Sequence, residues 1–318
     1  MKSILLIIPY FGQWPLWFDA HLKSIEKNPT INWLCPTDCV VPNRYPENIK
    51  FLKTSLEEFN QKINNKVKVD VPLAGRKFCD LKIAYGDVFA EEVAEYDFWG
   101  ICDMDIIWGD IRKFMTEDLL MTYDVISSRK NAISGHFNIF KNDKKLNELY
   151  KKLPHYKTLF SSEKLYRTDE VTLTDFIKES EVFKREDLKV YWNKILCNQE
   201  RGRDSHQEYY LDRWLWDNGK MLNTQTGEEV MYLHFINWKK KMHFSQINFS
   251  DAQSFFYISF NGIHYKKNSK LKKKIQFFLN SFMGYYIKEK RRLRIKKLKK
   301  IKHRIQRKIL KNVSIYTY

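Results

Sequence analysis

The sequence of 318 residues contains little glycine, proline or cysteine. It has 11 Gly, 8 Pro and 5 Cys, whereas hydrophobic residues make up 43% and aromatic residues 15%. This composition excludes collagen-like, low-complexity and disordered chains, because it supplies enough apolar surface for a packed core. The length fits one large domain, or one domain with an appendage.

The cysteines do not form the patterns that bind zinc or build a disulfide framework. Their number is odd, and there is no Cys-x-x-Cys pair among Cys35, Cys39, Cys79, Cys102 and Cys197. We therefore expect reduced thiols in a cytoplasmic protein.

Long hydrophobic runs are also missing. The first apolar run, Ile4 to Ile8, ends at Pro9 and is not followed by the small residues of a cleavage site. No window approaches the roughly 18–20 apolar residues that a membrane-spanning helix needs. We therefore expect a protein that is made and kept inside the cell, without a transmembrane segment.

Acidic residues are nearly absent from the C-terminal end. Residues 264–318 contain 20 Lys and Arg and one acidic residue, Glu289, whereas residues 1–263 contain 36 basic and 37 acidic residues. The net charge of +18 therefore comes from the tail, and the body is almost neutral. We divide the chain into a main domain, 1–263, and a basic tail, 264–318.

The first half of the chain alternates between strand and helix patterns. Continuous apolar or aromatic runs predict strands at 4–8, 31–34, 48–52, 96–102, 123–127 and 137–140. Apolar residues at helical spacing predict helices at 17–25, 55–65 and 80–94. This order is typical of a layered α/β domain. The aromatic residues at 209–216 also show helical spacing, which favours core packing over a sugar-binding role.

Two carboxylates follow the strand at 96–102. Asp103 and Asp105 are two positions apart, so in extended backbone they project to the same side. Ligands of α/β sheets bind at the carboxyl ends of strands, where two carboxylates suit a hard divalent cation. Such a pair is common by chance, and a solvated turn is the alternative. An EF-hand is excluded, because Ile107 and Trp108 occupy positions of that calcium-binding loop where a ligand and the glycine belong.

These residues belong to a longer series of short motifs. In chain order, the series is Ile8-Pro-Tyr-Phe-Gly12, Pro36-Thr-Asp38, Arg76-Lys-Phe-Cys-Asp-Leu-Lys82, Cys102-Asp-Met-Asp105, Ser134-Gly-His-Phe-Asn138, Thr168-Asp-Glu170 and His234-Phe-Ile-Asn-Trp-Lys239. Over roughly residues 4–240 the series resembles nucleotide-sugar glycosyltransferases of the GT-A fold that build bacterial capsule or lipopolysaccharide glycans. The resemblance implies a Rossmann-like mixed central sheet flanked by helices, with 1–263 as the catalytic domain.

The resemblance also implies a donor site for a nucleoside-diphosphate sugar, with a UDP-sugar expected. The loop residues Pro9, Tyr10 and Gly12, together with Asp38, would surround the base and ribose. For Asp38 an Asx-turn or a helix cap is an equal alternative. Lys82, ahead of Arg76 and Lys77 as the preferred candidate, would neutralise the diphosphate, or else it is an ordinary surface lysine.

The implied metal site holds Mn²⁺ or Mg²⁺. Asp103 and Asp105 would bind the cation, Asp103 would also reach the ribose, and His234 would complete the ligand set. Lys239, five residues further on, would contact a phosphate. The alternative for His234 is a structural histidine at the end of a strand.

Two acidic residues are the implied catalytic groups. Asp169 and Glu170 resemble the Asp-Glu pair that faces the donor sugar in retaining transferases, whereas inverting enzymes need one carboxylate as a general base. The alternative is an acidic cap at the N-terminus of the following helix. His136, after Gly135, would line the sugar pocket.

The tail has three interpretations. Its apolar residues fall on one helical face among many Lys and Arg, which suits an anionic membrane surface. Nucleic acid is disfavoured, because the body of the protein is not basic, and a solvated helical extension is the plain alternative. Overall we expect a metal-dependent glycosyltransferase, peripheral on the inner face of the cell membrane, with a glycan or lipid-linked acceptor. The competing hypothesis is a non-catalytic membrane- or nucleic-acid-binding adaptor on a transferase-like fold.

Overall fold

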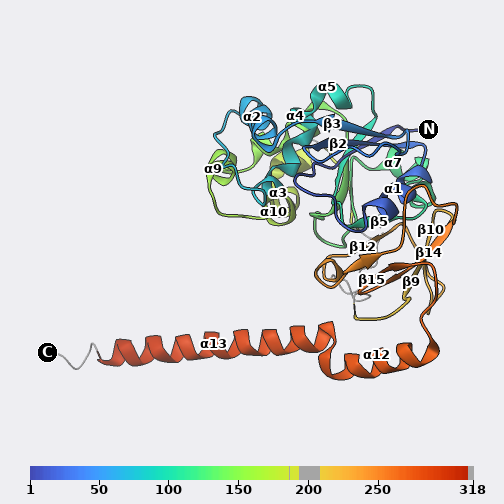
Figure 1. The fold of residues 1–318 in the computed structure, drawn as a ribbon. Helices are drawn as coiled ribbons and strands as arrows, with labels where there is room; N and C mark the ends of the chain where they lie inside the picture. The colour runs from blue at the N-terminus through green and yellow to red at the C-terminus, as the bar shows by residue number, and fades with distance from the viewer. Residues whose placement is uncertain (186, 193–207, 314–318) are drawn as a thin grey trace.

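The computed structural model describes residues 1–185, 187–192 and 208–313. Its centre is a mixed seven-stranded sheet in the order β3-β2-β1-β4-β7-β6-β8 (Figure 1). The first four strands of this order are parallel to one another, and β7 is antiparallel to both of its neighbours, β4 and β6. The strands are β1 Ile4–Ile7, β2 Ile31–Thr37, β3 Ile49–Lys53, β4 Phe98–Cys102, β6 Val125–Ser127, β7 Phe137–Lys141 and β8 Val190–Tyr191.

Strand β1 is buried on both faces, as its continuous apolar run predicts. Side chains of a strand alternate between the two faces of the sheet. Leu5 and Ile7 accordingly pack in one apolar core, and Ile4 and Leu6 pack in the other. The sheet therefore separates two cores, and both must be covered by other elements.

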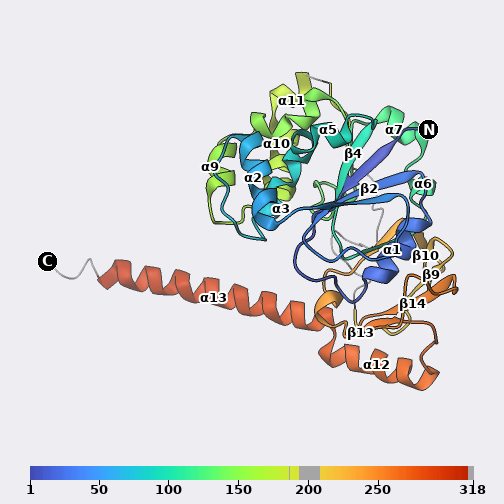
Figure 2. The same cartoon turned by 45° about the horizontal axis from the view of Figure 1, so that its top comes forward.

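Helices cover the two faces. One face carries α2, α3 and α10, and the other carries α1 (Figure 2). Helix α2 begins with a capping box, in which the side chain of Ser55 accepts a hydrogen bond from the backbone N–H of Glu58 and the side chain of Glu58 accepts one from that of Ser55. The helices of this region are α1 Phe18–Glu26, α2 Leu56–Val67, α3 Phe78–Leu81, α4 Tyr85–Val88, α5 Ala90–Val93, α6 Ile111–Phe114, α7 Glu117–Thr122, α8 Lys144–Asn147, α9 Tyr156–Ser161, α10 Leu173–Glu179 and α11 Glu181–Arg185.

The single helix predicted at 80–94 is wrong in its continuity. The segment forms α3, a 3₁₀ turn over Lys82–Ala84, α4 and α5. Phe89 leaves the helical region (φ −109°, ψ 34°) while its ring is fully buried. A Cβ atom on Gly86 would lie 2.3 Å from the Trp99 ring. Packing of the Phe89 ring in the core thus overrides the regular helical period, whereas Gly86 stays within α4 and allows the close approach of Trp99.

A second, six-stranded sheet follows in the order β11-β10-β9-β14-β15-β13. The helical interpretation of 209–216 is wrong, because Trp214 and Trp216 belong to strand β9 and are both buried. Their expected packing in a core is confirmed. The strands are β9 Trp214–Asp217, β10 Lys220–Asn223, β11 Glu229–Val230, β13 Phe244–Ser245, β14 Phe255–Ser259 and β15 Gly262–His264.

A short antiparallel pair connects the two parts of the main domain. Strand β5, Ile106–Trp108, pairs with β12, Tyr232–His234. The register places His234 opposite Ile106. A residue near the end of the main domain is thereby brought next to the Asp103–Asp105 segment.

The tail is helical, as its pattern predicts. The boundary expected after residue 263 falls inside β15, and α12 spans Lys270–Met283 after its N-cap, Ser269. Helix α13 spans Tyr285–Val313. The fold class, a mixed α/β sheet flanked by helices and followed by a basic helical tail, is confirmed. Among the described residues, no helix combines the length and the apolar character needed to cross a bilayer.

A buried ion pair fastens the chain that follows α9. Lys77 Nζ lies 2.9 Å from Asp80 Oδ2 and also donates to the carbonyl oxygen of Lys164 at 3.0 Å. The Asp80 carboxylate accepts from the backbone N–H groups of Tyr166 and Thr168 at 3.0 and 2.9 Å. Both side chains are almost inaccessible to solvent. The pair therefore holds residues 164–168 against α3.

We predict that Asp80→Ala lowers the free energy of unfolding by about 3–5 kcal/mol, because it leaves a buried ammonium without its counter-ion and two backbone N–H groups without their acceptor. Urea denaturation followed by tryptophan fluorescence measures the change. The control is Glu181→Ala, which breaks the exposed pair Glu181–Lys184 and costs less than about 1 kcal/mol. Equal losses for the two variants would contradict this role of Asp80.

Candidate functional site

A cleft of about 550 Å³ opens at the carboxyl ends of β1 and β4. These neighbouring parallel strands end side by side, since Ile7 is in register with Ile101. Such an edge is where ligands bind in α/β sheets. The cleft is lined by six residues that the sequence analysis singled out: Pro9, Tyr10, Lys82, Asp103, Asp105 and Lys239.

Apolar and aromatic side chains to which the sequence analysis gave no role form much of the remaining wall. Phe78, Lys82 and Tyr85 all line the cleft and stand at positions i, i+4 and i+7. This helical spacing from Lys82 is the signal that could have identified the other two. Phe11, which belongs to the motif Ile8-Pro-Tyr-Phe-Gly12, and Phe59 also line the cleft, and Phe59 carries no comparable signal in the sequence.

Lys82 connects the cleft to the loop before β7. Its ammonium lies 2.5 Å from Asp103 Oδ1 and donates to the carbonyl oxygen of Gly135 at 2.6 Å. Burial alone would lower the pKa of Lys82, but the carboxylates of Asp103 and Asp169 outweigh it and raise that pKa. Lys82 is therefore a largely buried cation, and the alternative of an ordinary surface lysine is wrong.

Asp105 is a buried carboxylate with a histidine and a lysine as neighbours. Its Oδ1 lies 3.4 Å from His234 Nε2, and its Oδ2 lies 2.8 Å from Lys239 Nζ. The backbone N–H of Phe235 donates to the Asp105 carbonyl at 2.8 Å, which keeps β12 in place beside this residue. Burial would raise the pKa of Asp105, but His234 and Lys239 hold it well below its usual range.

Three side chains converge in a way that suits a divalent cation. Each of Asp103, Asp105 and His234 offers one ligand atom, and these three atoms lie within 4.8 Å of one another. Two carboxylates supply the oxygen ligands that Mg²⁺ and Mn²⁺ prefer, and an imidazole nitrogen favours a transition metal. The donor set therefore fits Mn²⁺ or Mg²⁺. Both carboxylates also have a lysine partner, so a cation would compete with Lys82 and Lys239.

His136 lies behind His234, and it is absent from the described lining of the cleft. The two rings stack with centroids 4.0 Å apart. His136 Nε2 lies 2.8 Å from the Tyr232 hydroxyl, and its Nδ1 lies 2.9 Å from Ser134 Oγ. Burial, together with the charge of His234, holds the pKa of His136 well below its usual value. A neutral His136 thus supports the ring of His234 from the interior.

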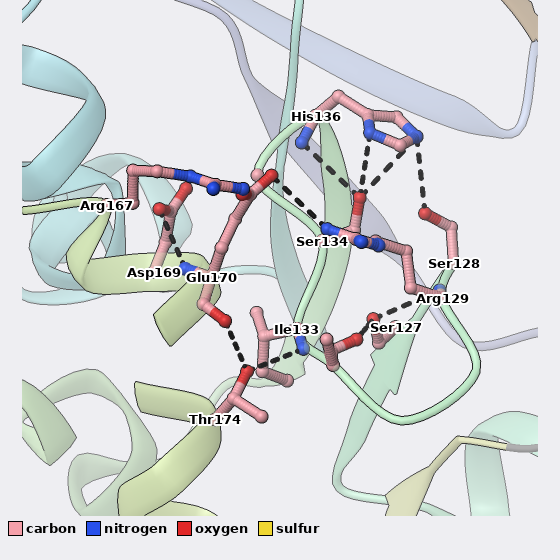
Figure 3. Close-up of polar contacts among 12 residues, drawn as sticks. Ser127, Ser128, Arg129, Ile133, Ser134, His136, Arg167, Asp169, Glu170 and Thr174 are labelled. Atoms are coloured by element: carbon pink, nitrogen blue, oxygen red, sulfur yellow. Dashed lines mark hydrogen bonds and ion pairs between the residues drawn. The ribbon is translucent and has the colours of Figure 1, made fainter. Parts of the chain in front are cut away.

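Asp169 and Glu170 lie within a π-helical turn, Thr168–Thr172, that leads into α10. Figure 3 shows the surroundings of Glu170, whose carboxylate forms ion pairs with Arg167 and, at 3.5 Å, with Arg129. Asp169 is almost fully buried, and its Oδ1 accepts from the backbone N–H of Glu170 at 2.8 Å. The two acids therefore have different environments, and neither serves as a simple helix cap.

Gly135 separates this acidic pair from the Lys82 side of the cleft. Its carbonyl accepts from Lys82, while a Cβ atom at this position would lie 2.8 Å from Glu170 Oε1 and 3.1 Å from Asp169 Oδ2. A glycine is therefore required for the close approach of the two carboxylates. In the described structure, neither acid is part of the cleft wall.

The loop after β1 is held by Asp38. The backbone N–H of Gly12, which has a positive φ of 100°, donates to Asp38 Oδ1 at 2.7 Å. Asp38 thus organises the loop that carries Pro9 and Tyr10, and neither Gly12 nor Asp38 is among the described residues that line the cleft. Lys77, considered beside Lys82 as a diphosphate ligand, is instead turned into the interior to pair with Asp80.

The chain belongs to a protein family described as a family of unknown function (DUF6625), whose model matches residues 6–267. No curated protein matches the sequence.

Two solved structures are among those similar to this chain. One is the galactosyltransferase LgtC in complex with donor and acceptor sugar analogs, with 11% identity and a TM-score of 0.34, covering 53% of this chain and 71% of the other. The second is a glycosyltransferase involved in the glycosylation of the major capsid of PBCV-1, with 8% identity and a TM-score of 0.40, covering 74% of this chain and 93% of the other.

We predict that Gly135→Ala destabilises the protein by about 1–3 kcal/mol, because the added methyl group meets a carboxylate that two arginines hold in place. In a Glu170→Ala background the same change costs less, since its closest contact is gone. Urea denaturation of both single variants and the double variant measures this coupling. Additive losses would show that Glu170 does not restrict position 135.

The pH dependence of stability tests the environment of Asp169. Burial raises the pKa of Asp169 to about 6, so between pH 4 and 6 the folded protein retains a proton that the unfolded chain has lost. Stability therefore falls as the pH rises through this window. We predict that Asp169→Asn removes this fall and stabilises the protein by about 2–3 kcal/mol at pH 7 but little at pH 4. Urea titrations at both pH values measure it, with Asp217→Asn, at an exposed position, as a control that leaves the fall in stability in place.

Proposed function

We propose that the protein is a metal-dependent glycosyltransferase that uses a nucleoside-diphosphate sugar. The observation that carries the proposal is the meeting of Asp103, Asp105, Lys82 and Lys239 in one cleft at the carboxyl ends of β1 and β4. Carboxylates for a divalent cation and lysines for phosphates are what a diphosphate leaving group requires.

The donor would lie across the cleft. Tyr10 and Phe11, on the loop that Asp38 holds, offer aromatic surface for a base. Asp103, Asp105 and His234 would hold the cation, which when bound offsets the negative charge of the diphosphate. Lys239 is partly exposed, so its ammonium has the freedom to leave Asp105 and contact a phosphate oxygen. Lys82 is held by Gly135 and would contribute a fixed positive charge.

We assign the proton-handling role in the reaction to Asp169 ahead of Glu170. The Glu170 carboxylate is neutralised by Arg129 and Arg167. Asp169, in contrast, forms no ion pair with any of the residues that the structure describes. A pKa of about 6 also suits acid–base chemistry near neutral pH. Glu170 is the second candidate, as a carboxylate that stabilises positive charge on the sugar in a retaining reaction.

The finer parts of the proposal concern the substrates and the place of action. We propose a UDP-sugar as donor and a glycan or lipid-linked acceptor, used in bacterial surface polysaccharide synthesis at the cytoplasmic face of the cell membrane. The sequence resemblance supports these parts.

One observation favours a second function, that of a non-catalytic membrane- or nucleic-acid-binding adaptor. Both carboxylates of the Asp103–Asp105 pair already have lysine partners. An adaptor on a transferase-like fold would keep such ion pairs permanently, whereas a transferase must exchange them for a cation. Donor turnover separates the two functions.

The first experiment is a panel of UDP-, GDP- and CMP-sugars with and without Mn²⁺. Thermal shift and donor hydrolysis are measured for each. A Mn²⁺-dependent response to one nucleotide supports the transferase and names the donor class. If the folded protein shows neither a shift in melting temperature nor hydrolysis with any of the donors, the result favours the adaptor.

We predict that Asp105→Asn lowers Mn²⁺-dependent turnover at least about 100-fold, because one metal-binding carboxylate is lost. The matched control is Asp110→Asn, five residues further on. Asp110 caps α6 by accepting from the backbone N–H of Lys113, and asparagine is an equally good cap. Full metal-dependent turnover in Asp105→Asn would contradict the assignment of this carboxylate.

A further inference from the structure

The C-terminal helices form an extended surface outside the body of the protein. Helix α12 lies beside the six-stranded sheet, and α13 extends away from both sheets in the two views (Figures 1 and 2). We infer that α12 and α13 together bind the surface of an anionic lipid bilayer. This binding is independent of the chemistry of the cleft.

Helix α12 contacts the body through a polar side. Lys273 Nζ lies 2.7 Å from Asp212 Oδ2, and Asn280 Nδ2 donates to the carbonyl oxygen of Tyr209 at 3.0 Å. Lys273 and Asn280 are seven residues apart and therefore lie on one face of the helix. Asp212 is buried, and Asn268 donates to it as well, through its backbone N–H at 2.9 Å. The polar side of α12 is thus firmly docked.

The apolar side of α12 points away from the body. Leu271, Ile275, Phe278 and Phe282 follow one another at i, i+4, i+7 and i+11, and they are 68%, 50%, 63% and 55% exposed. At 100° per residue, this stripe lies about 180° from the docked face. A surface helix normally buries its apolar stripe against the core. The inverted orientation of α12 indicates that something other than the body covers the stripe.

Helix α13 continues this surface with a higher density of charge. Its 29 residues extend about 44 Å and include 14 Lys and Arg but one acidic residue, Glu289. Leu298, Ile301 and Ile305, spaced three and four apart, are 64%, 43% and 52% exposed. The helix therefore combines a narrow apolar stripe with basic flanks.

The junction between the two helices is held by a side chain of the body. The Glu208 carboxylate accepts from the backbone N–H groups of Tyr285 and, at 3.2 Å, of Tyr286 at the start of α13. A Cβ atom on Gly284 would lie 2.3 Å from Glu208 Oε1. These contacts fix the direction of α13 relative to α12, which argues against a loose solvated extension.

An anionic bilayer satisfies both features of this surface. Phe278 and Phe282 would enter the headgroup region, while lysines would lie among the lipid phosphates, each strengthening binding about fivefold. Nucleic acid would match the charge but leave the apolar stripe exposed. A second copy of the tail would cover the stripe but would bring two strongly basic helices together.

The test uses flotation of the full-length protein with two kinds of vesicle, pure phosphatidylcholine and a mixture with about one third phosphatidylglycerol. We expect binding to the mixed vesicles alone. Phe278→Ser combined with Phe282→Ser weakens binding about tenfold or more, and Met121→Ser, at an exposed position of α7, does not.

A second pair of variants tests the charge. Glutamine at four lysines of α13 should weaken binding about tenfold or more, whereas glutamine at four exposed lysines of the body should not. The two sets are Lys296, Lys297, Lys299 and Lys300 in the tail, and Lys50, Lys144, Lys145 and Lys157 in the body. Far-ultraviolet circular dichroism and an unchanged melting temperature verify that each variant is folded.

Three results would overturn the inference. The first is equal vesicle binding by the parent and both tail variants. The second is binding to single-stranded RNA without binding to vesicles. The third is a dimer in sedimentation that the phenylalanine variant dissociates, again without vesicle binding. No sugar donor is present in these measurements, so their outcome is separate from that of the transferase proposal.

Discussion

The contact between Lys82 and its two oxygen partners determines the shape of the candidate site. A largely buried ammonium needs acceptors to compensate for lost hydration, and here they are Asp103 Oδ1 and the carbonyl of Gly135. These acceptors come from the loop after β4 and the loop before β7. Gly135 in turn permits the close approach of Asp169 and Glu170. One cation therefore positions both sets of carboxylates.

Charge balance follows from the same arrangement. Asp103 and Asp105 are paired with Lys82 and Lys239, and Glu170 is paired with two arginines. A cation or a phosphate that enters the cleft must therefore displace one of these ion-pair partners. The two lysines differ in their freedom to do so, because Lys82 is anchored by a backbone carbonyl whereas Lys239 is partly exposed. This difference suits Lys239 to a mobile role at a phosphate and Lys82 to a fixed one.

The main domain buries its apolar side chains, whereas helix α12 of the tail exposes them. In the main domain, apolar strands lie between helices, and both faces of β1 are covered. In α12, polar side chains dock on the body and the apolar stripe is exposed. Two carboxylates of the body make this orientation specific. Asp212 contacts Lys273 of α12 and Asn268 just before that helix, and Glu208 accepts from backbone N–H groups at the start of α13.

Much of the local structure could be predicted from the sequence. The run at Ile4–Ile8, the capping residues Ser55 and Glu58 and the spacing of the tail residues depend on neighbours along the chain, and the elements at these places are confirmed. The helix predicted at 80–94 is interrupted at Lys82–Ala84 and at Phe89, whose ring is fully buried in the core. The helical interpretation of 209–216, where the structure has β9, was wrong because short aromatic segments satisfy helical and extended spacing equally well.

The sequence by itself determined the α/β class and the separate basic tail, because composition and periodicity carry that information. The short list of candidate site residues came from the series of short motifs and the resemblance that it implies. Only the tertiary structure decided which of them meet. The pairing of β5 with β12 places His234 beside Asp105, across more than a hundred residues of chain. The tertiary structure also decided that Lys77 is buried, that His136 supports His234, and that the apolar stripe of α12 points outward. These outcomes depend on strand register and on contacts between distant segments, for which the spacing of residues along one segment holds no information.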